Sequence, residues 1–183
     1  MQQMLASLRA RREDERGFTL IELMVVVLII AILIAIAIPT FLGAKSRAQD
    51  KAAQSSLRNG LTNAKGIYTD TDSYLSSTAA ALLAAEPSLQ FKAPGTASTT
   101  AKQVSVGTVT TAGVTNEIYL VAKSASGSCF VIGDAANGPG TGFAKLATGA
   151  CSATNAIAVL GAVAAGAAGS TTSGTSDAWV SAF

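Results

Sequence analysis

The chain has 183 residues and a formal net charge of only +2, so no charge imbalance indicates a nucleic-acid partner. Histidine is absent, which removes the commonest general base and the commonest metal ligand. Aromatic residues make up 5% of the chain and charged residues 13%, and small residues dominate its C-terminal half. The composition favours a surface exposed outside the cell over an enzyme core. We therefore predict a protein that is not an enzyme and that binds no cofactor and no metal ion.

Residues 1–17 carry four arginines close to the long apolar run that follows them. Arginines that flank a membrane segment favour a cytoplasmic N-terminus. A secretory signal peptide has an apolar region of roughly 7–15 residues and then a small-residue cleavage site. Here the apolar run is longer and no A-x-A site follows it. Taken alone, these residues predict an uncleaved single-pass anchor.

The apolar run from Phe18 to Ile38 contains one ionisable side chain, Glu22, and no polar side chain after it. A helix over 18–38 would be about 30 Å long, which matches the hydrocarbon thickness of a bilayer. An unpaired carboxylate costs roughly 2.5–3.5 kcal/mol at the centre of a span and less near the interface. We therefore expect a membrane-spanning helix whose one carboxylate lies close to the headgroups.

Residues typical of a helix continue after the apolar run, over 39–70. We therefore predict one continuous helix over Phe18–Tyr68. Pro39 lacks an amide donor, which predicts a kink or a local break at that point. Apolar side chains at helical spacing form one stripe in the second half: Ala53, Leu57, Leu61, Ala64 and Tyr68. This half is amphipathic, so we expect it to dock on a sheet. Gly60 and Gly66 weaken the helix, and we interpret both as tolerated rather than as positions of close packing.

Residues 71–101 are expected to link the helix to the sheet. Within them we predict a short helix over Thr78–Ala85, capped by a serine or threonine and stopped by Pro87. Asp70 and Asp72 lie at the end of the long helix and resemble ligands of a hard cation. A turn or cap explains them better, because a third ligand and a glycine turn are missing.

The segment 102–183 has the pattern of an antiparallel sheet followed by an Ala/Gly/Ser-rich tail. Four candidate strands are separated by turn residues: Lys102–Thr110, Glu117–Lys123, Ser128–Asp134 and Gly142–Ala147. The second and third of these predict an antiparallel hairpin. Ala156–Val163 is a candidate strand that would complete the sheet. We expect one face of the sheet to pack on the helix stripe and the other to face solvent.

The tail beyond these strands is poor in structural signals. Gly169–Ser176 is of low complexity. Trp179 and Phe183 are predicted to pin the C-terminus back on the domain, with an exposed adhesive patch as the alternative.

Two cysteines, Cys129 and Cys151, both follow the apolar run. An even count there is consistent with one disulfide in an oxidising compartment. A reactive thiol is a poor alternative because no histidine is present to activate it, and zinc would lack ligands.

The stretch over 16–39 is R-G-F-T-L-I-E-L-M-V-V-V-L-I-I-A-I-L-I-A-I-A-I-P. It closely resembles the N-terminus of class III signal-peptide proteins, the type IV pilins and their pseudopilin relatives. In that family a membrane aspartyl protease cuts on the cytoplasmic side directly after the glycine and methylates the new N-terminus. The resemblance implies cleavage between Gly17 and Phe18, N-methylation of Phe18 and a mature chain over 18–183. In detail it covers about 16–41, and beyond that it is a likeness of architecture.

The resemblance also implies the pilin fold, which is α+β. A long N-terminal helix would have a membrane-spanning and fibre-core part at 18–38 and an amphipathic part at 39–70. It would pack on a small C-terminal antiparallel β-sheet. Cys129 and Cys151 would pair to bound a loop, as the family often shows.

Two further positions take their roles from the resemblance. Pro39 falls where many family members carry a helix-kinking proline. Glu22 would pair in a fibre with the cationic amine of Phe18 on a neighbouring subunit. Because an uncompensated buried charge disfavours other registers, we expect this pair to set the axial register of the fibre.

The function implied is that of a structural subunit of a type IV pilus, a filament for adhesion, motility or DNA uptake. Its partners would be further copies of itself, the prepilin peptidase and methylase, the assembly machinery in the membrane and minor pilins, with no nucleic acid bound directly. The protein would be a single-pass protein of the cytoplasmic membrane before assembly and part of an extracellular filament afterwards.

Two other functions remain open. A pseudopilin of a type II secretion or competence system would have the same N-terminus. The major secretion pseudopilins usually have a calcium-binding C-terminal loop and lack the disulfide, whereas this chain has two cysteines and few acids near its end. A membrane-anchored enzyme is the remote alternative, because the sequence has no constellation of catalytic residues.

Overall fold

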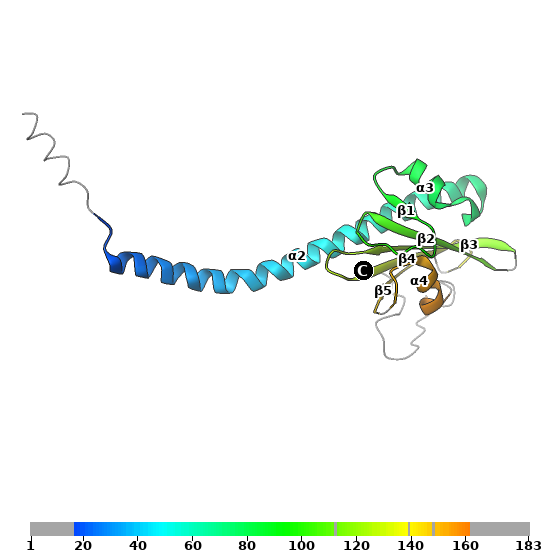
Figure 1. Cartoon of the computed structure of the whole chain (residues 1–183). Coiled ribbons are helices and arrows are strands. Elements are labelled where there is room, and N and C mark those ends of the chain that lie inside the picture. The colour runs from blue at the N-terminus through cyan, green and yellow to red at the C-terminus, as the bar shows by residue number, and fades with distance from the viewer. Residues whose placement is uncertain (1–16, 112, 139, 148, 162–183) are drawn as a thin grey trace, which may run out of the picture. The chain divides into compact units, whose positions relative to one another are not determined.

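The computed structural model describes residues 17–111, 113–138, 140–147 and 149–161 (Figure 1). Residues 1–16 of the predicted leader 1–17, and the predictions made for Gly169–Ser176, Trp179 and Phe183, lie outside the described residues. The chain forms two units, 1–44 and 45–183.

The main helix, α2, spans Leu20–Thr71, close to the predicted range. It continues through Pro39 without a break. In the second unit its buried positions are Ala53, Leu57, Gly60, Leu61 and Ala64, so the predicted apolar stripe is confirmed, with Tyr68 partly buried beside it. The 3.6-residue periodicity of these positions is what turns them all to one side of the helix.

Among the described residues, the sheet of the second unit has five strands in the order β1-β2-β3-β4-β5. Their bounds are β1 Gln90–Lys92, β2 Gln103–Thr111, β3 Val114–Lys123, β4 Cys129–Ala135 and β5 Gly140–Leu146. The four predicted strands are confirmed as β2 to β5, all paired antiparallel, including the β3–β4 hairpin. Strand β1 was not predicted, and it pairs with β2 in parallel, so the sheet is mixed rather than wholly antiparallel.

Alternation along the strands divides the core into two layers. One layer packs the α2 stripe against β2, β3 and β4 through side chains such as Val104, Ile118 and Leu120. The next residues along β3, Tyr119 and Val121, belong to a second buried cluster on the opposite face. This alternation is the two-residue period of a strand.

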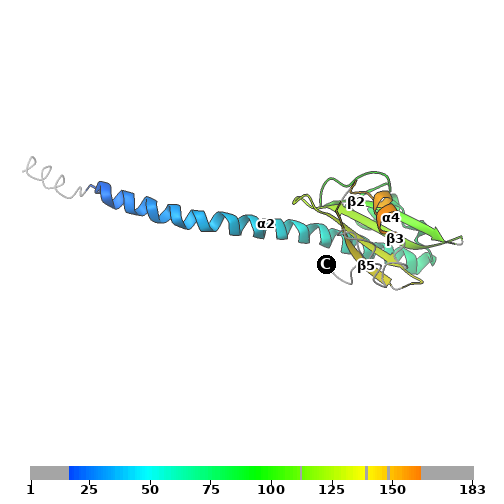
Figure 2. The same ribbon diagram turned by 90° about the horizontal axis from the view of Figure 1, so that it is seen from below.

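Helix α4, Ala153–Leu160, covers the second face near β2 and β3 (Figures 1 and 2). The predicted strand Ala156–Val163 is therefore wrong over its described part, and the prediction of a solvent-facing second face is wrong where α4 lies. Ser152 caps the helix by accepting a hydrogen bond from the Asn155 N–H. Alanine-rich sequence favours a helix once such a cap is present, and the apolar run alone could not separate the two alternatives.

The linker 71–101 contains two short helices as well as β1. Helix η1 spans Tyr74–Ser76, and α3 spans Ala79–Ala85 with Thr78 as its N-cap. The predicted short helix and its cap are thus confirmed.

Gly60 corrects one interpretation drawn from the sequence. A Cβ atom at this position would lie 3.3 Å from Leu120 Cδ1 and 3.3 Å from Phe91 Cε1. Gly60 is therefore a position of close packing between α2 and the sheet. Gly66 has open space around it, as tolerance predicts.

The change Gly60→Val is expected to lower the free energy of unfolding by about 1–3 kcal/mol, because the added methyl groups overpack the core. Gly66→Val is the matched control and should be neutral or slightly stabilising, since valine favours the helix more than glycine does. Urea unfolding of the full chain in detergent, followed by near-UV circular dichroism, measures both. Equal stability of the two variants would contradict the packing role of Gly60.

Candidate processing site and assembly segment

The Gly17–Phe18 bond lies just before α2, in backbone without regular secondary structure. Both residues are exposed, and the Phe18 side chain is 79% exposed. A glycine on the N-terminal side adds backbone freedom and no side-chain bulk. The bond is therefore open to a protease cleft without prior unwinding of the helix.

Thr19 directly precedes α2 and caps its first turn. Its Oγ1 accepts a hydrogen bond from the Glu22 N–H at 3.2 Å, and its carbonyl accepts one from the Leu23 N–H at 3.2 Å. The T-x-x-E spacing is that of a capping box, in which a threonine oxygen satisfies a free N–H of the first turn. Sequence reasoning missed this role of Thr19, although the spacing itself is a visible signal.

Glu22 lies in the first turn of α2, where the helix dipole favours a negative charge. Its carboxylate is at the end of the apolar segment that is nearest to Phe18. The geometry thus puts the one acid of this segment within one turn of the N-terminus that cleavage would create.

The part of α2 that lies in the first unit presents apolar side chains to its surroundings on every side. Its large aliphatic and aromatic residues between Leu20 and Leu42 are all exposed in the isolated chain. By length and composition, α2 is the one helix among the described residues that could cross a membrane, with a mean hydropathy of 3.3 in its most apolar window. Such a surface is not stable in water, so a bilayer or other apolar helices must cover it.

Pro39 leaves one gap in the hydrogen-bond ladder of α2. It has no N–H to donate toward the carbonyl four residues earlier, at Ala35. The next residue, Thr40, uses its hydroxyl to donate to the Ile36 carbonyl at 3.1 Å. The helix persists across this weak point, and a kink at Pro39 remains a prediction.

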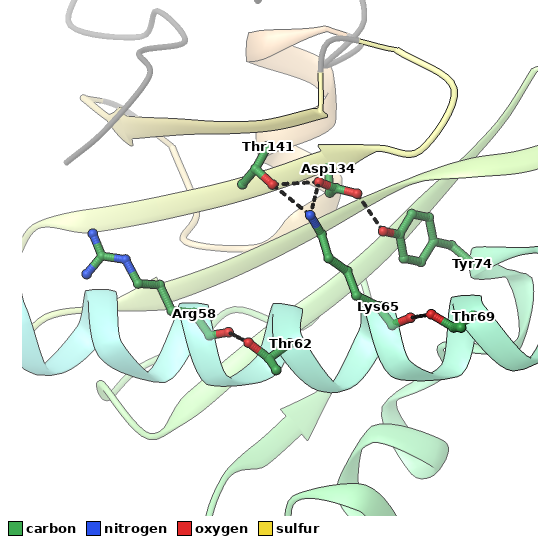
Figure 3. A network of polar contacts seen from close by, with 7 residues as sticks. All are labelled: Arg58, Thr62, Lys65, Thr69, Tyr74, Asp134 and Thr141. Atoms are coloured by element: carbon green, nitrogen blue, oxygen red, sulfur yellow. Dashed lines mark hydrogen bonds and ion pairs between the residues drawn. The ribbon is translucent and has the colours of Figure 1, made fainter.

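In the second unit, a buried carboxylate ties α2 to the sheet (Figure 3). Lys65 Nζ lies 2.8 Å from Asp134 Oδ1, and the Thr141 hydroxyl donates to the same oxygen at 2.6 Å. The Tyr74 hydroxyl donates to Asp134 Oδ2 at 2.5 Å. The Asp134 side chain is 4% exposed, whereas that of Lys65 is 47% exposed. One acid on β4 thereby joins α2, η1 and β5.

The charge of Asp134 is stabilised by these donors. Burial by itself raises the pKa of its carboxyl, but hydrogen bonds from Lys65, Thr141 and Tyr74 outweigh burial and leave the pKa below its ordinary value. Burial and the bond to Asp134 raise the pKa of Tyr74, so this phenol keeps its proton. The network is structural: it fixes the helix on the sheet. No local pattern marked Asp134, because its partners are distant in sequence.

Asp72 lies in the turn that ends α2, as the turn interpretation of Asp70 and Asp72 predicts. The Asp72 N–H donates to the Tyr68 carbonyl at 2.7 Å, and Asp72 has a φ of 52°, which closes the end of α2 as a turn. Within the residues that the structure describes, no group of three or more potential metal-ligating acids, cysteines or histidines is found.

Cys129 and Cys151 form a disulfide with a Cα–Cα distance of 5.6 Å. Cys129 begins β4, and Cys151 directly precedes the cap of α4. The Cys151 carbonyl also accepts a hydrogen bond from the Ser98 N–H at 2.7 Å. The bond therefore attaches α4 and its start to the sheet face that it covers.

Replacing both Cys129 and Cys151 by serine is expected to lower the free energy of unfolding by about 3 kcal/mol, from loop entropy alone. Proteolysis should then cut first near α4, since it is the element that the bond anchors. Comparison of limited proteolysis with and without the double change tests this. Unchanged stability together with unchanged cleavage sites would contradict it.

The comparison with known families concerns the N-terminal segment around the Gly17–Phe18 bond. The family model of the prokaryotic N-terminal methylation motif matches residues 13–38. No curated protein and no solved structure was found to match the chain. The matched residues include the Gly17–Phe18 bond, Glu22 and the apolar run. The chain thus has a class III signal peptide of the type IV pilin kind, and this motif together with the α+β fold supports a pilin-like or pseudopilin-like protein.

Proposed function

We propose that this protein is a structural subunit of a type IV pilus. A prepilin peptidase cleaves it after Gly17 on the cytoplasmic side and methylates Phe18. The apolar part of the helix, 18–38, holds the subunit in the cytoplasmic membrane. The membrane assembly machinery then moves that part into the core of an extracellular filament.

One observation carries this proposal: an apolar helix surface exposed on every side, with a single carboxylate in its first turn. A permanent membrane anchor needs the apolar surface but gains nothing from Glu22, which raises the cost of insertion. A segment that leaves the bilayer for a bundle of identical helices gains a specific partner for the acid. The amine of Phe18 on a neighbouring copy is a cation that cleavage supplies at the same level of the helix.

The pair of charges acts on register more than on affinity. Apolar helices can slide along one another at small cost, because aliphatic contacts are alike at many offsets. An ion pair in an apolar core strongly disfavours any offset that leaves either charge alone. One acid at the start of each helix is therefore sufficient to fix the axial rise between subunits.

The test is mass spectrometry of filaments sheared from cells that express the chain. A dominant protein that begins at N-methylated Phe18 is expected. A variant with Gly17→Leu is the control for processing, because the added side chain obstructs the cleavage cleft, and it should be absent from the sheared material.

Other outcomes separate the alternatives. A processed chain that stays in the membrane fraction would indicate a pseudopilin of a secretion or competence system. An unprocessed chain in the membrane would contradict the proposal and favour a permanent anchor.

A further inference from the structure

An apolar groove of about 230 Å³ lies at the β2 edge of the sheet, beyond the end of β1. Its lining combines η1 and the start of α3, the segment after β1, and the middle of β2, and it includes Leu75, Thr78, Pro94, Val106, Gly107 and Thr108. These are small aliphatic side chains and hydroxyls, with no charged side chain. The groove therefore favours a neutral, largely apolar occupant.

The groove exists because β1 is much shorter than β2. Their pairing ends at Lys92 and Ser105. The chain then turns away at Pro94, which cannot donate to a ladder and whose carbonyl accepts from the Thr154 N–H of α4 at 2.9 Å. Among the described residues, no strand pairs with this side of β2 beyond Ser105.

The backbone of β2 offers hydrogen bonds along this open edge. The Lys102 carbonyl accepts from the Gln90 N–H of β1, so even-numbered residues at this end of β2 direct their backbone groups to that edge. By the same two-residue alternation, the N–H and carbonyl of Thr108 point toward the groove. An extended segment could add there as a continuation of β1.

The described chain ends at Gly161, which contacts β3, the strand next to the β2 edge. The Gly161 carbonyl accepts a hydrogen bond from the Tyr119 hydroxyl at 2.9 Å. Tyr119 of β3 is the register partner of Gly107 of β2, which lines the groove. Residues 162–176 follow Gly161 and can extend by up to about 50 Å. One strand spacing is about 5 Å, so the following segment 177–183 can reach the β2 edge without strain.

The segment 177–183, D-A-W-V-S-A-F, has no charged side chain after Asp177 and is largely apolar, which is the chemistry that the groove accepts. Its alternation puts Trp179, Ser181 and Phe183 on one face of an extended strand. Trp179 is the one tryptophan of the chain. A cavity of about 150 Å³ is known to hold a benzene ring, so a groove of this volume can take an indole.

We propose that the C-terminal segment 177–183 of the same chain binds along the open edge of β2, with the indole of Trp179 in the groove. The segment would lengthen the sheet at the position where β1 stops. It would also cover an edge that is otherwise available for pairing between molecules. This inference does not depend on the role of the protein in a filament.

The fluorescence of Trp179 in the full chain, held in detergent micelles, tests this directly. Its emission should be blue-shifted, and acrylamide should quench it several-fold less than in a free peptide of residues 174–183. Leu75→Asp places a charge in the groove at a side chain that is 67% exposed, so folding should be preserved. In this variant the emission should shift to the red and quenching should rise several-fold.

The matched control is Leu83→Asp, which changes another exposed leucine that does not line the groove. It should leave emission and quenching as in the unchanged chain. Equal effects of the two changes, or peptide-like quenching before any change, would overturn the proposal. Protection of Trp179 that grows with protein concentration would also overturn it, in favour of a segment from a second copy.

Hydrogen exchange gives a readout independent of fluorescence. Trp179→Ala should speed the exchange of the Thr108 amide several-fold and leave the amides of β5, at the other edge of the sheet, unchanged. Faster exchange in β5 with no change at Thr108 would place the segment on the wrong edge for this proposal.

Discussion

Glu22→Ala is expected to leave membrane insertion intact and to reduce filament yield at least about tenfold, because the amine of Phe18 would be buried without its counter-charge. The start of α2 should be unaffected, since Thr19 accepts its hydrogen bond from the Glu22 backbone, which alanine retains. Sheared filament yield and the amount of chain in the membrane fraction are the two measurements. Both are normalised to total expression.

Two conservative changes at the same position separate charge from shape. Glu22→Gln keeps the length of the side chain and removes its charge, so it should fail as alanine does. Glu22→Asp keeps the charge one methylene closer to the helix and should retain part of the yield. Normal filaments from Glu22→Ala would refute the register role, and normal filaments from Glu22→Gln would show that the charge is not needed.

Asp134→Asn is expected to lower the free energy of unfolding by about 2–3 kcal/mol, because it removes the charge on which Lys65, Thr141 and Tyr74 converge. The loss should stay below that of a fully buried ion pair, since Lys65 can turn toward water. Asp50→Asn is the matched control. Its carboxylate accepts a hydrogen bond from Ser126 at a more exposed place, so the change should cost no more than about 1 kcal/mol.

The stability of the unchanged protein and that of its Asp134→Asn variant should also differ in their dependence on pH. The pKa of Asp134 is lower in the folded state than the ordinary value of 3.8. Its contribution to stability is therefore fully present above that value and is lost as the pH falls through the lower pKa of the folded state. Because asparagine does not titrate, the difference in stability between the two proteins should shrink below about pH 4. A difference that stays constant down to strongly acid pH would contradict the assigned charge state.

These predictions concern two parts of the molecule that differ in what stabilises them. The described part of the first unit, 17–44, has no buried residue, so its behaviour depends on what surrounds it. The second unit has a core on both faces of its sheet, and Asp134 and the disulfide attach α2 and α4 to those faces. Changes in the first unit should therefore affect assembly, and changes in the second should affect folding.

Local patterns in the sequence were sufficient for the long helix, its apolar stripe and the four antiparallel strands. Each depends on a periodicity that a short window contains, because the side-chain period of a helix or strand is set by its own backbone. The methylation motif, which includes the Gly17–Phe18 bond and Glu22, is likewise contiguous in the sequence. Thr19 belongs to this group too, and its capping spacing was visible though overlooked.

The tertiary structure decided the features whose partners are distant along the chain. Strand β1 is only three residues long and becomes a strand because β2 lies beside it. Gly60 becomes a packing position only where Leu120 and Phe91 approach it, and Asp134 is a stable buried charge only where Lys65 and Tyr74 reach it. Helix α4 was mistaken for a strand because a short apolar run is ambiguous until a cap and a sheet face select one form. Sequence alone thus determined the N-terminal methylation motif, and three-dimensional contacts decided how the second unit is held together.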